Sequence, residues 1–217
     1  ILNGLLCLID EVYRKLFGLT EPDLTDENWR GVNQAIIERT ADPDWYRWVT
    51  EDVCRLVTQI RNVPWTEGWE PQFFTCTLRM EEALELLNEG TRSKLAAETG
   101  RSLESLPQLK DALVAYTESY NERGNRGIKL AHAYTRTLAS EEVPAEEAST
   151  IYDRALRGQA PTPAEVKRFQ DHIIFFLGEM ASEMTLVFQI HTGAQGTWGW
   201  VPNSNPVHLL PLIHRYR

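Results

Sequence analysis

Four segments of the chain have the hydrophobic pattern of strands, and helical patterns separate them. A nearly continuous apolar run at 185–190 is typical of a strand that a parallel sheet buries on both faces. Shorter runs predict further strands at 53–60, 72–78 and 128–132. After the last strand, Asn205-Pro206 predicts a helix N-cap followed by proline at the first helical position. The end of the chain therefore forms a strand, a loop and a helix.

A block of helices is expected ahead of the first strand. Apolar residues spaced three and four apart predict a helix over 1–17, and Gly18 is a natural C-terminal stop. Further helices are predicted to begin near Thr25 and at Asp42, which precedes a proline. We interpret residues 1–52 as a helical insertion rather than as a domain of its own.

Helical patterns also fill the intervals between the strands. One continues from residue 80 to 123, and Pro144 and Pro163 each begin another helix. Thr162 and Glu165 have the spacing of a capping box, in which each side chain bonds to the other residue's free backbone amide. Alternation of strands and helices predicts parallel strands joined by right-handed crossovers, which is an α/β fold.

The same alternation sets the expected domain organisation. Residues 53–217 are expected to form successive βα units. Together with the helical insertion at 1–52 they are expected to make one partial barrel domain that spans 1–217. The chain begins within a helical pattern and ends at a helix after which a further strand would follow. We therefore expect a piece of a longer protein rather than a complete small one, with exposed sheet edges that favour association, including a homo-oligomer.

Composition narrows the class of partner. With 42% hydrophobic and 24% charged residues, and no apolar run near the ~18 residues of a membrane span, the sequence predicts a soluble globular protein. A net charge of −9 argues against nucleic acid and anionic membranes as partners. Three cysteines without metal or redox spacing indicate a reducing compartment, which we take to be the cytoplasm.

His191 is the first candidate for chemistry, because it ends the last predicted strand. In α/β folds, functional residues gather in loops at the carboxyl ends of strands. A neutral imidazole held there is a good ligand for a divalent metal. The structural alternative is a histidine bonded to a nearby carbonyl, and about equal weight falls on each.

Lys129 lies in an otherwise apolar strand, where a lysine is costly to bury without a partner. It could bind a substrate carboxylate, be modified to bridge metals, or reach solvent from an edge strand. Tyr134 and Arg136 follow in the next loop and could hold an anionic substrate, since arginine suits a bidentate carboxylate contact. Arg79 at another strand end is a weaker candidate of the same kind, and His132 is expected to pack against a helix.

Aromatic residues in the last loop are a further candidate binding surface. Trp198 and Trp200 alternate with glycines that would allow close approach to a ligand. Such a loop could equally cover the site without touching the ligand. The remaining histidines, at 172, 208 and 214, fall within helical patterns and are interpreted as structural.

These segments resemble the amidohydrolase superfamily, close to its uronate isomerase-like members. The resemblance rests on Gly-Ile-Lys-Leu-Ala-His-Ala-Tyr-Thr-Arg-Thr-Leu at 127–138, Val-Phe-Gln-Ile-His-Thr-Gly at 187–193 and Asn-Ser-Asn-Pro at 203–206. Phe17-Gly18-Leu19 and Asn28-Trp29 are similar to the insertion after the first strand of that group. The resemblance implies a (β/α)8 TIM barrel with a metal at its C-terminal face. The four predicted strands would be strands 2 to 5 of that barrel.

The resemblance also implies roles for individual residues. His191 would be the fifth-strand metal ligand, and Lys129 falls on the fourth strand, where some members have a carbamylated lysine between two metals. Uronate isomerase-like members use one metal and do not need that group, so the role of Lys129 stays open. The family's first-strand His-x-His and eighth-strand Asp do not occur in these 217 residues, so this piece alone is expected to be inactive.

Our main functional hypothesis is a metal-dependent hydrolase or isomerase of a small carboxylate-bearing molecule. The expected cofactor is a divalent metal, with zinc as the first choice. Lys129 would be catalytic, His191 a ligand, and Tyr134, Arg136 and Trp198 would bind substrate. The alternatives are a uronate isomerase or a decarboxylase of the same superfamily, or a non-catalytic binding module on a degenerate half-barrel.

Overall fold

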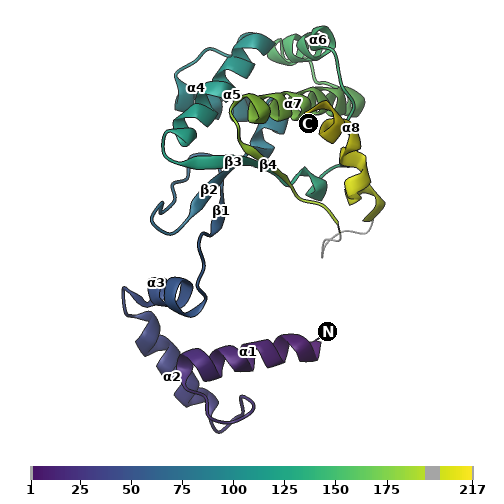
Figure 1. The fold of residues 1–217 in the computed structure, drawn as a ribbon. Coiled ribbons are helices and arrows are strands. Elements are labelled where there is room, and N and C mark those ends of the chain that lie inside the picture. The colour runs from purple at the N-terminus through teal and green to yellow at the C-terminus, as the bar shows by residue number, and fades with distance from the viewer. Residues whose placement is uncertain (1, 194–200, 217) are drawn as a thin grey trace. The chain divides into compact units, whose positions relative to one another are not determined.

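The chain divides into two compact units in the computed structural model, which describes residues 2–193 and 201–216 (Figure 1). One unit comprises Ile1–Val57 and the other Thr58–Arg217. The division falls close to the end predicted for the helical block, residue 52. Each unit is described by itself.

The first unit is helical, as predicted. It contains α1 (Leu2–Phe17), α2 (Trp29–Thr40), α3 (Trp45–Arg47) and the π-helix η1 (Trp48–Val53). Gly18 follows α1 with a φ of +76°, a left-handed conformation that glycine adopts without steric cost. The rings of Phe17, Trp45 and Trp48 lie in a row, with centroids 5.4 and 5.2 Å apart, and join α1 to the α3–η1 segment.

The prediction of a strand at 53–60 is wrong. Residues up to Val53 are helical, and the first strand, β1, runs over Ile60–Val63. β-Branched residues suggested the strand, but Val57 is 100% exposed and has no neighbouring strand to pack on. Pairing with the next strand starts only at Ile60, and Val63 is the first fully buried position.

The second unit contains the predicted parallel sheet. β1, β2 (Thr75–Arg79), β3 (Asn125–Leu130) and β4 (Val187–Ile190) are neighbours in chain order, and each adjacent pair is parallel. The α/β fold class with four parallel strands is therefore confirmed.

Helices connect these strands. The first group lies between β2 and β3: the 3-10 helix η2 (Glu81–Glu85), α4 (Glu89–Thr99) and α5 (Leu106–Asn121). Between β3 and β4 come the 3-10 helix η3 (His132–Tyr134), α6 (Ala145–Leu156) and α7 (Pro163–Glu183). After β4 follow the 3-10 helices η4 (Val201–Ser204) and η5 (Pro206–Leu209), and then α8 (Leu210–Arg215).

Two predicted helix starts are confirmed by their caps. Thr162 and Glu165 form both bonds of the capping box at the start of α7. The Asn205 side chain accepts a 3.0 Å hydrogen bond from the Val207 amide, directly before Pro206 opens η5. These local contacts fix the helix starts on either side of β4.

Among the described residues, no helix is long and apolar enough to span a bilayer.

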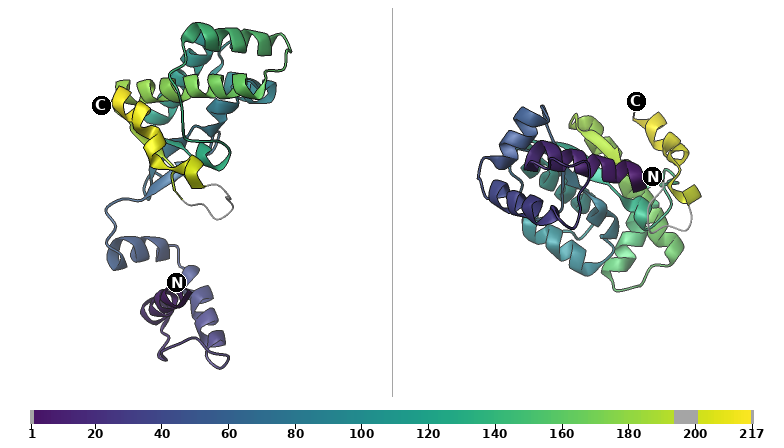
Figure 2. Two further views of the ribbon diagram at one scale, coloured as in Figure 1. Left: turned by 90° about the vertical axis from the view of Figure 1, so that its right-hand side faces the viewer. Right: turned by 90° about the horizontal axis from the view of Figure 1, so that it is seen from below.

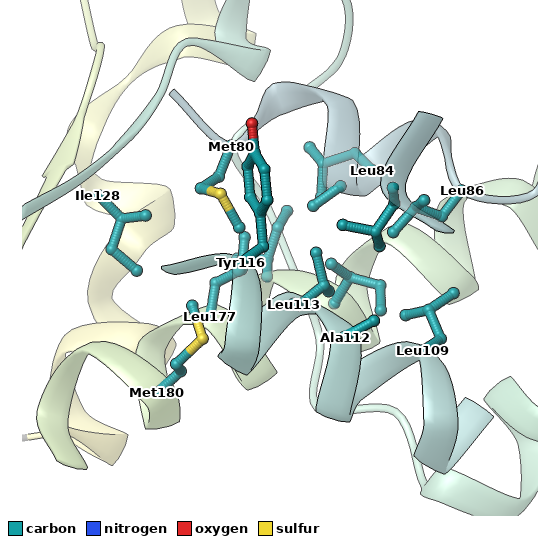
Figure 3. Packing of buried hydrophobic residues seen from close by; sticks show 14 of the residues in the cluster. Met80, Leu84, Leu86, Leu109, Ala112, Leu113, Tyr116, Ile128, Leu177 and Met180 are labelled. Carbon is teal, nitrogen blue, oxygen red and sulfur yellow. The ribbon is translucent and has the colours of Figure 1, made fainter. Parts of the chain in front are cut away.

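The hydrophobic core lies between one face of the sheet and the helices. In Figures 1 and 2, α4 to α7 lie on the same side of the sheet. Ile128 points from β3 into this layer, where Leu113 of α5 and Leu177 of α7 are also fully buried (Figure 3). Leu78 of β2 is in register with Ile128 and is fully buried as well. Because side chains alternate along a strand, the intervening residues point to the opposite face. That face has polar residues, and the candidate site develops along it.

Candidate active site

A row of three polar side chains crosses the carboxyl ends of the strands. Arg79 at the end of β2 is in register with Lys129 of β3, and Lys129 is in register with Gln189 of β4. Residues in register on parallel strands share a face, so these three side chains leave the sheet on the side away from the core. This places two basic groups next to each other at one edge.

Lys129 is buried in this row, with only 7% of its surface exposed. Burial lowers the pKa of its ammonium, and the charge of Arg79 lowers it further, while Glu81 acts in the opposite direction. β3 lies between β2 and β4, so the interpretation that the lysine reaches solvent from an edge strand is wrong. A cation buried at a central position is a candidate for binding an anionic group of a ligand.

Glu81 completes the group, and the sequence analysis did not single it out. The Nε of Arg79 donates a 3.2 Å hydrogen bond to Oε2 of Glu81. The second carboxylate oxygen, Oε1, is buried and has no hydrogen-bond partner among the described residues. The available signal was an acidic residue two positions after a strand-ending arginine, a pattern too common to be informative by itself.

His191 lies directly after β4, as predicted. Its backbone amide donates a 2.9 Å hydrogen bond to Leu130, which continues the pairing of β3 and β4 to the edge. The ring packs on Tyr134, with centroids 4.8 Å apart and planes inclined by 35°. His191 and Tyr134 therefore meet beyond the carboxyl edge, in the segments that follow the neighbouring parallel strands β4 and β3.

Arg136 does not have the free guanidinium expected of a substrate-binding residue. Its Nη2 forms an ion pair with the fully buried Asp171 of α7, and its Nη1 donates a 3.2 Å hydrogen bond to Gln170. Its Nε donates to the Thr137 carbonyl. These contacts attach the loop after β3 to α7, so Arg136 acts as a structural tie in this chain.

His132 is the most buried histidine of the unit, with 2% of its surface exposed. Neither ring nitrogen has a hydrogen-bond partner among the described residues. Burial, helped by the positive charge of Arg136 and opposed by Asp171, lowers the pKa of the imidazole to about 4. The ring is therefore neutral at pH 7, with one donor and one acceptor nitrogen.

A pocket of about 470 Å³ opens between the segments that follow β2 and β3, with Gln170 of α7 on one side. Its lining includes Arg79, Glu81, His132, Tyr134, Arg136 and Gln170. Lys129 and His191 are not part of this lining and lie on the adjoining strand ends. Trp198, the remaining predicted substrate contact, lies outside the described residues.

The segment after β4 closes back onto its strand end. Gly193 and Ser204 exchange hydrogen bonds, each of 2.8 Å, between the Gly193 amide and the Ser204 carbonyl and between the Ser204 hydroxyl and the Gly193 carbonyl. The Leu138 amide donates to the Asn203 carbonyl. The Asn-Ser-Asn-Pro segment is thus held against Gly193, which follows β4, and against Leu138 after β3.

The described residues do not form a complete metal centre. Among them, no three His, Cys, Asp or Glu side chains gather closely enough to hold a metal ion. His191 has the chemistry of a ligand, but a stable divalent site needs several such groups. The described residues at this edge therefore do not by themselves supply three ligands for a metal.

Comparison with known proteins identifies the family. The model of the UxaC glucuronate isomerase family matches residues 75–197, more than half of the 217 residues, and includes β2, β3, β4 and the pocket loops. The chain belongs to this family. The family is one of isomerases, which the sequence analysis held as an alternative to hydrolysis.

Individual relatives of the family agree. A uronate isomerase of Clostridium perfringens is 28% identical over 128 residues, covering 56% of this chain and 27% of the relative. The crystal structure of glucuronate isomerase from Caulobacter crescentus superposes with a TM-score of 0.72 at 18% identity, over 95% of this chain and 48% of that one. A structure described as a "putative metal-dependent hydrolase" from Lactobacillus casei has a TM-score of 0.57 at 13% identity, over 95% of this chain and 52% of that one.

The structural matches place the fold among the TIM-barrel-like uronate isomerase folds. The chain spans about half the length of these structures and its matched stretch about a quarter of the Clostridium protein. The assignment of β1 to β4 as barrel strands 2 to 5 remains a prediction.

Proposed function

We propose that the protein carrying this chain is a uronate isomerase, which interconverts an aldo-uronic acid and the corresponding keto-uronic acid. The family match across β2 to β4 is the observation that supports this most, because it spans the strand ends that build the pocket. Its substrate would be a small carboxylate-bearing sugar, in agreement with the two basic side chains, Arg79 and Lys129, at the same edge.

Aldose–ketose conversion moves a hydrogen between two neighbouring carbons and develops negative charge on an oxygen. Preorganised cations at the edge of a site stabilise such charge more than they would in water. Lys129, buried beside Arg79, is the proposed group for this role or for holding the substrate carboxylate. Tyr134 lines the same edge and, with Arg136 holding its loop in place, is proposed to position the substrate.

A divalent metal is part of the proposal, with zinc as our first choice and His191 as one of its ligands. The fold neighbour described as metal-dependent supports the metal, and the exit of His191 from the carboxyl edge supports the ligand role. A bound metal would polarise substrate oxygens as a Lewis acid. We also propose a cytoplasmic protein that can form homo-oligomers, supported by the free thiols of Cys54 and Cys76 and by the open sheet edges.

Replacing His191 with alanine in the intact protein is expected to lower the bound metal at least tenfold, since each ligand contributes strongly to metal affinity. Elemental analysis after dialysis measures the metal per chain. His214→Ala, a change at an exposed histidine of α8, serves as the control and should retain the metal. Equal metal content in the two variants would contradict the ligand role.

Incubation of the intact protein with D-glucuronate and a divalent metal tests the activity. We expect NMR spectra to show a keto-uronic acid accumulating to equilibrium, and a Lys129→Met variant to be at least tenfold slower. Lys15→Met, in the first unit, is the control for the lysine change. Loss of carbon dioxide would favour a decarboxylase, hydrolysis of an amide substrate would favour a hydrolase, and binding without turnover would favour the non-catalytic module.

A further inference from the structure

Two side chains in the pocket between the β2 and β3 loops have buried polar atoms that nothing in the described chain satisfies. These atoms are Oε1 of Glu81 and both ring nitrogens of His132. A buried donor or acceptor without a partner costs about 1–3 kcal/mol. Native structures therefore supply such groups with a partner, which can be a ligand.

The other polar side chains around the pocket do have protein partners. Arg136 is paired with Asp171, Gln170 donates to Glu85 at 3.3 Å, and Glu82 accepts two hydrogen bonds from Lys94. Among the residues that line the pocket, the unsatisfied atoms therefore belong to Glu81 and His132. Elsewhere in the described residues, Nε2 of His172 and Oε1 of Gln189 are also buried without a partner. Because the neighbouring side chains of the pocket are paired, the two unsatisfied groups are not the result of a loosely packed lining.

The unsatisfied atoms specify the chemistry of the partner. A carboxylate oxygen accepts hydrogen bonds only, and a neutral imidazole offers one acceptor and one donor. The complementary ligand must supply at least two donors and one acceptor within a short distance. Neighbouring hydroxyl groups meet this need because each both donates and accepts, whereas an aromatic or aliphatic acid does not.

A third unsatisfied acceptor lies in the row of polar side chains at the strand ends, next to Lys129. Oε1 of Gln189 is also buried without a partner among the described residues, and Gln189 is the register neighbour of Lys129. One unsatisfied acceptor therefore lies on β4 beside Lys129, and another lies on Glu81 of η2, two residues after the end of β2.

We propose that Glu81 and His132 determine specificity by binding hydroxyl groups of a polyhydroxylated acid. This rests on the proposed function for the identity of that acid, a uronic acid, but the hydroxyl requirement follows from the pocket alone. The pocket volume of about 470 Å³ lies within the usual range for small-molecule sites. Arg79 at its rim suits a ligand with a negative charge.

Equilibrium binding to the intact protein tests the proposal without turnover. One probe is the hydroxy acid obtained by reducing the aldehyde of D-glucuronate, and the other is hexanoate, which has the same number of carbons and no hydroxyl groups. Glu81→Met and His132→Phe should each weaken binding of the hydroxy acid about tenfold, the value of one good hydrogen bond. Hexanoate affinity should change less than twofold in both variants.

Matched controls separate binding from folding. Glu98→Met and His214→Phe make the same changes on α4 and α8, and both should leave the hydroxy acid affinity unchanged. Should His132→Phe fail to fold, His132→Asn retains a donor and an acceptor and should bind within about threefold of the wild-type chain. Thermal melting verifies the folded state of each variant.

Each outcome decides the proposal. Equal losses for both probes, unchanged affinity for the hydroxy acid, or no binding of it by the wild-type protein would overturn the role of Glu81 and His132. Failure of the proposed function has a different result, namely hydroxyl-dependent binding without isomerisation. Isomerisation with unaltered binding in both variants would leave the function standing and refute this inference.

Discussion

Replacing Asp171 with alanine is expected to destabilise the second unit by about 3–5 kcal/mol, because it leaves a buried guanidinium unpaired. The Asp171 side chain is fully buried and pairs with Arg136, whose side chain is only 11% exposed. It also accepts a 2.6 Å bond from Nζ of Lys167 and a 3.2 Å bond from the Glu141 amide. One carboxylate thus joins α7 to the loop that follows β3.

Native-state hydrogen exchange of the α7 and β3 amides measures this loss, since it reports the opening of the second unit separately from the first. Glu147→Ala is the matched control. It removes the carboxylate that pairs with Arg168, which lies on α7 as Asp171 does. That pair is partly exposed, and such pairs contribute about 0–1 kcal/mol. A loss in Asp171→Ala no greater than in the control would show that the network does not support the pocket.

The parts of this fold that sequence predicted depend on local signals. The capping box of Thr162 and Glu165 and the Asn205 cap involve residues two or three positions apart, so their spacing is readable from the chain. The apolar run before His191 gave the position of β4 to within two residues. Alternation of such elements leaves few possible arrangements, so the parallel order was predictable as well.

Other features depend on residues far apart in the chain, and these were missed. The ion pair between Arg136 and Asp171 spans 35 residues and was invisible to spacing. The role of Arg136 in binding substrate stays a prediction. The strand predicted at 53–60 failed because β-branched residues have strand propensity only where a neighbouring strand packs on them. Propensity alone could not supply that neighbour.

The candidate site contains both residues that the sequence identified and residues that only the structure revealed. Sequence placed Lys129 within the third predicted strand and His191 at the end of the fourth. In the structure Lys129 lies on β3, one residue before its end, and His191 directly follows the parallel neighbour β4. Their chemical roles are still predictions. Glu81 and His132 stood out only in three dimensions, because an unsatisfied buried atom is defined by its surroundings rather than by its residue type.

Lowering the pH from 7 to 4 is expected to cost the wild-type chain roughly 3 kcal/mol more stability than a His132→Phe variant. The pKa of His132 is about 4 in the folded chain, against an ordinary value of 6.5. The unfolded state therefore binds a proton first, and the contribution of His132 is complete above pH 6.5 and lost as the pH falls toward 4. Burial is the main cause, with Arg136 adding to it and Asp171 opposing it.

Comparison with the variant isolates the contribution of His132 to the pH dependence, because all other groups titrate in both proteins. Phenylalanine fills the site of the imidazole without a titrating group, so its pH profile reports everything except His132. Hydrogen exchange of the β3 amides at pH 7, 5.5 and 4 gives the opening free energy of each protein. Parallel pH profiles of the two proteins would mean that the pKa of His132 is the same in the folded and unfolded states. That would require water or a charged partner at its ring, and it would remove the basis for an unsatisfied imidazole that binds a hydroxyl group.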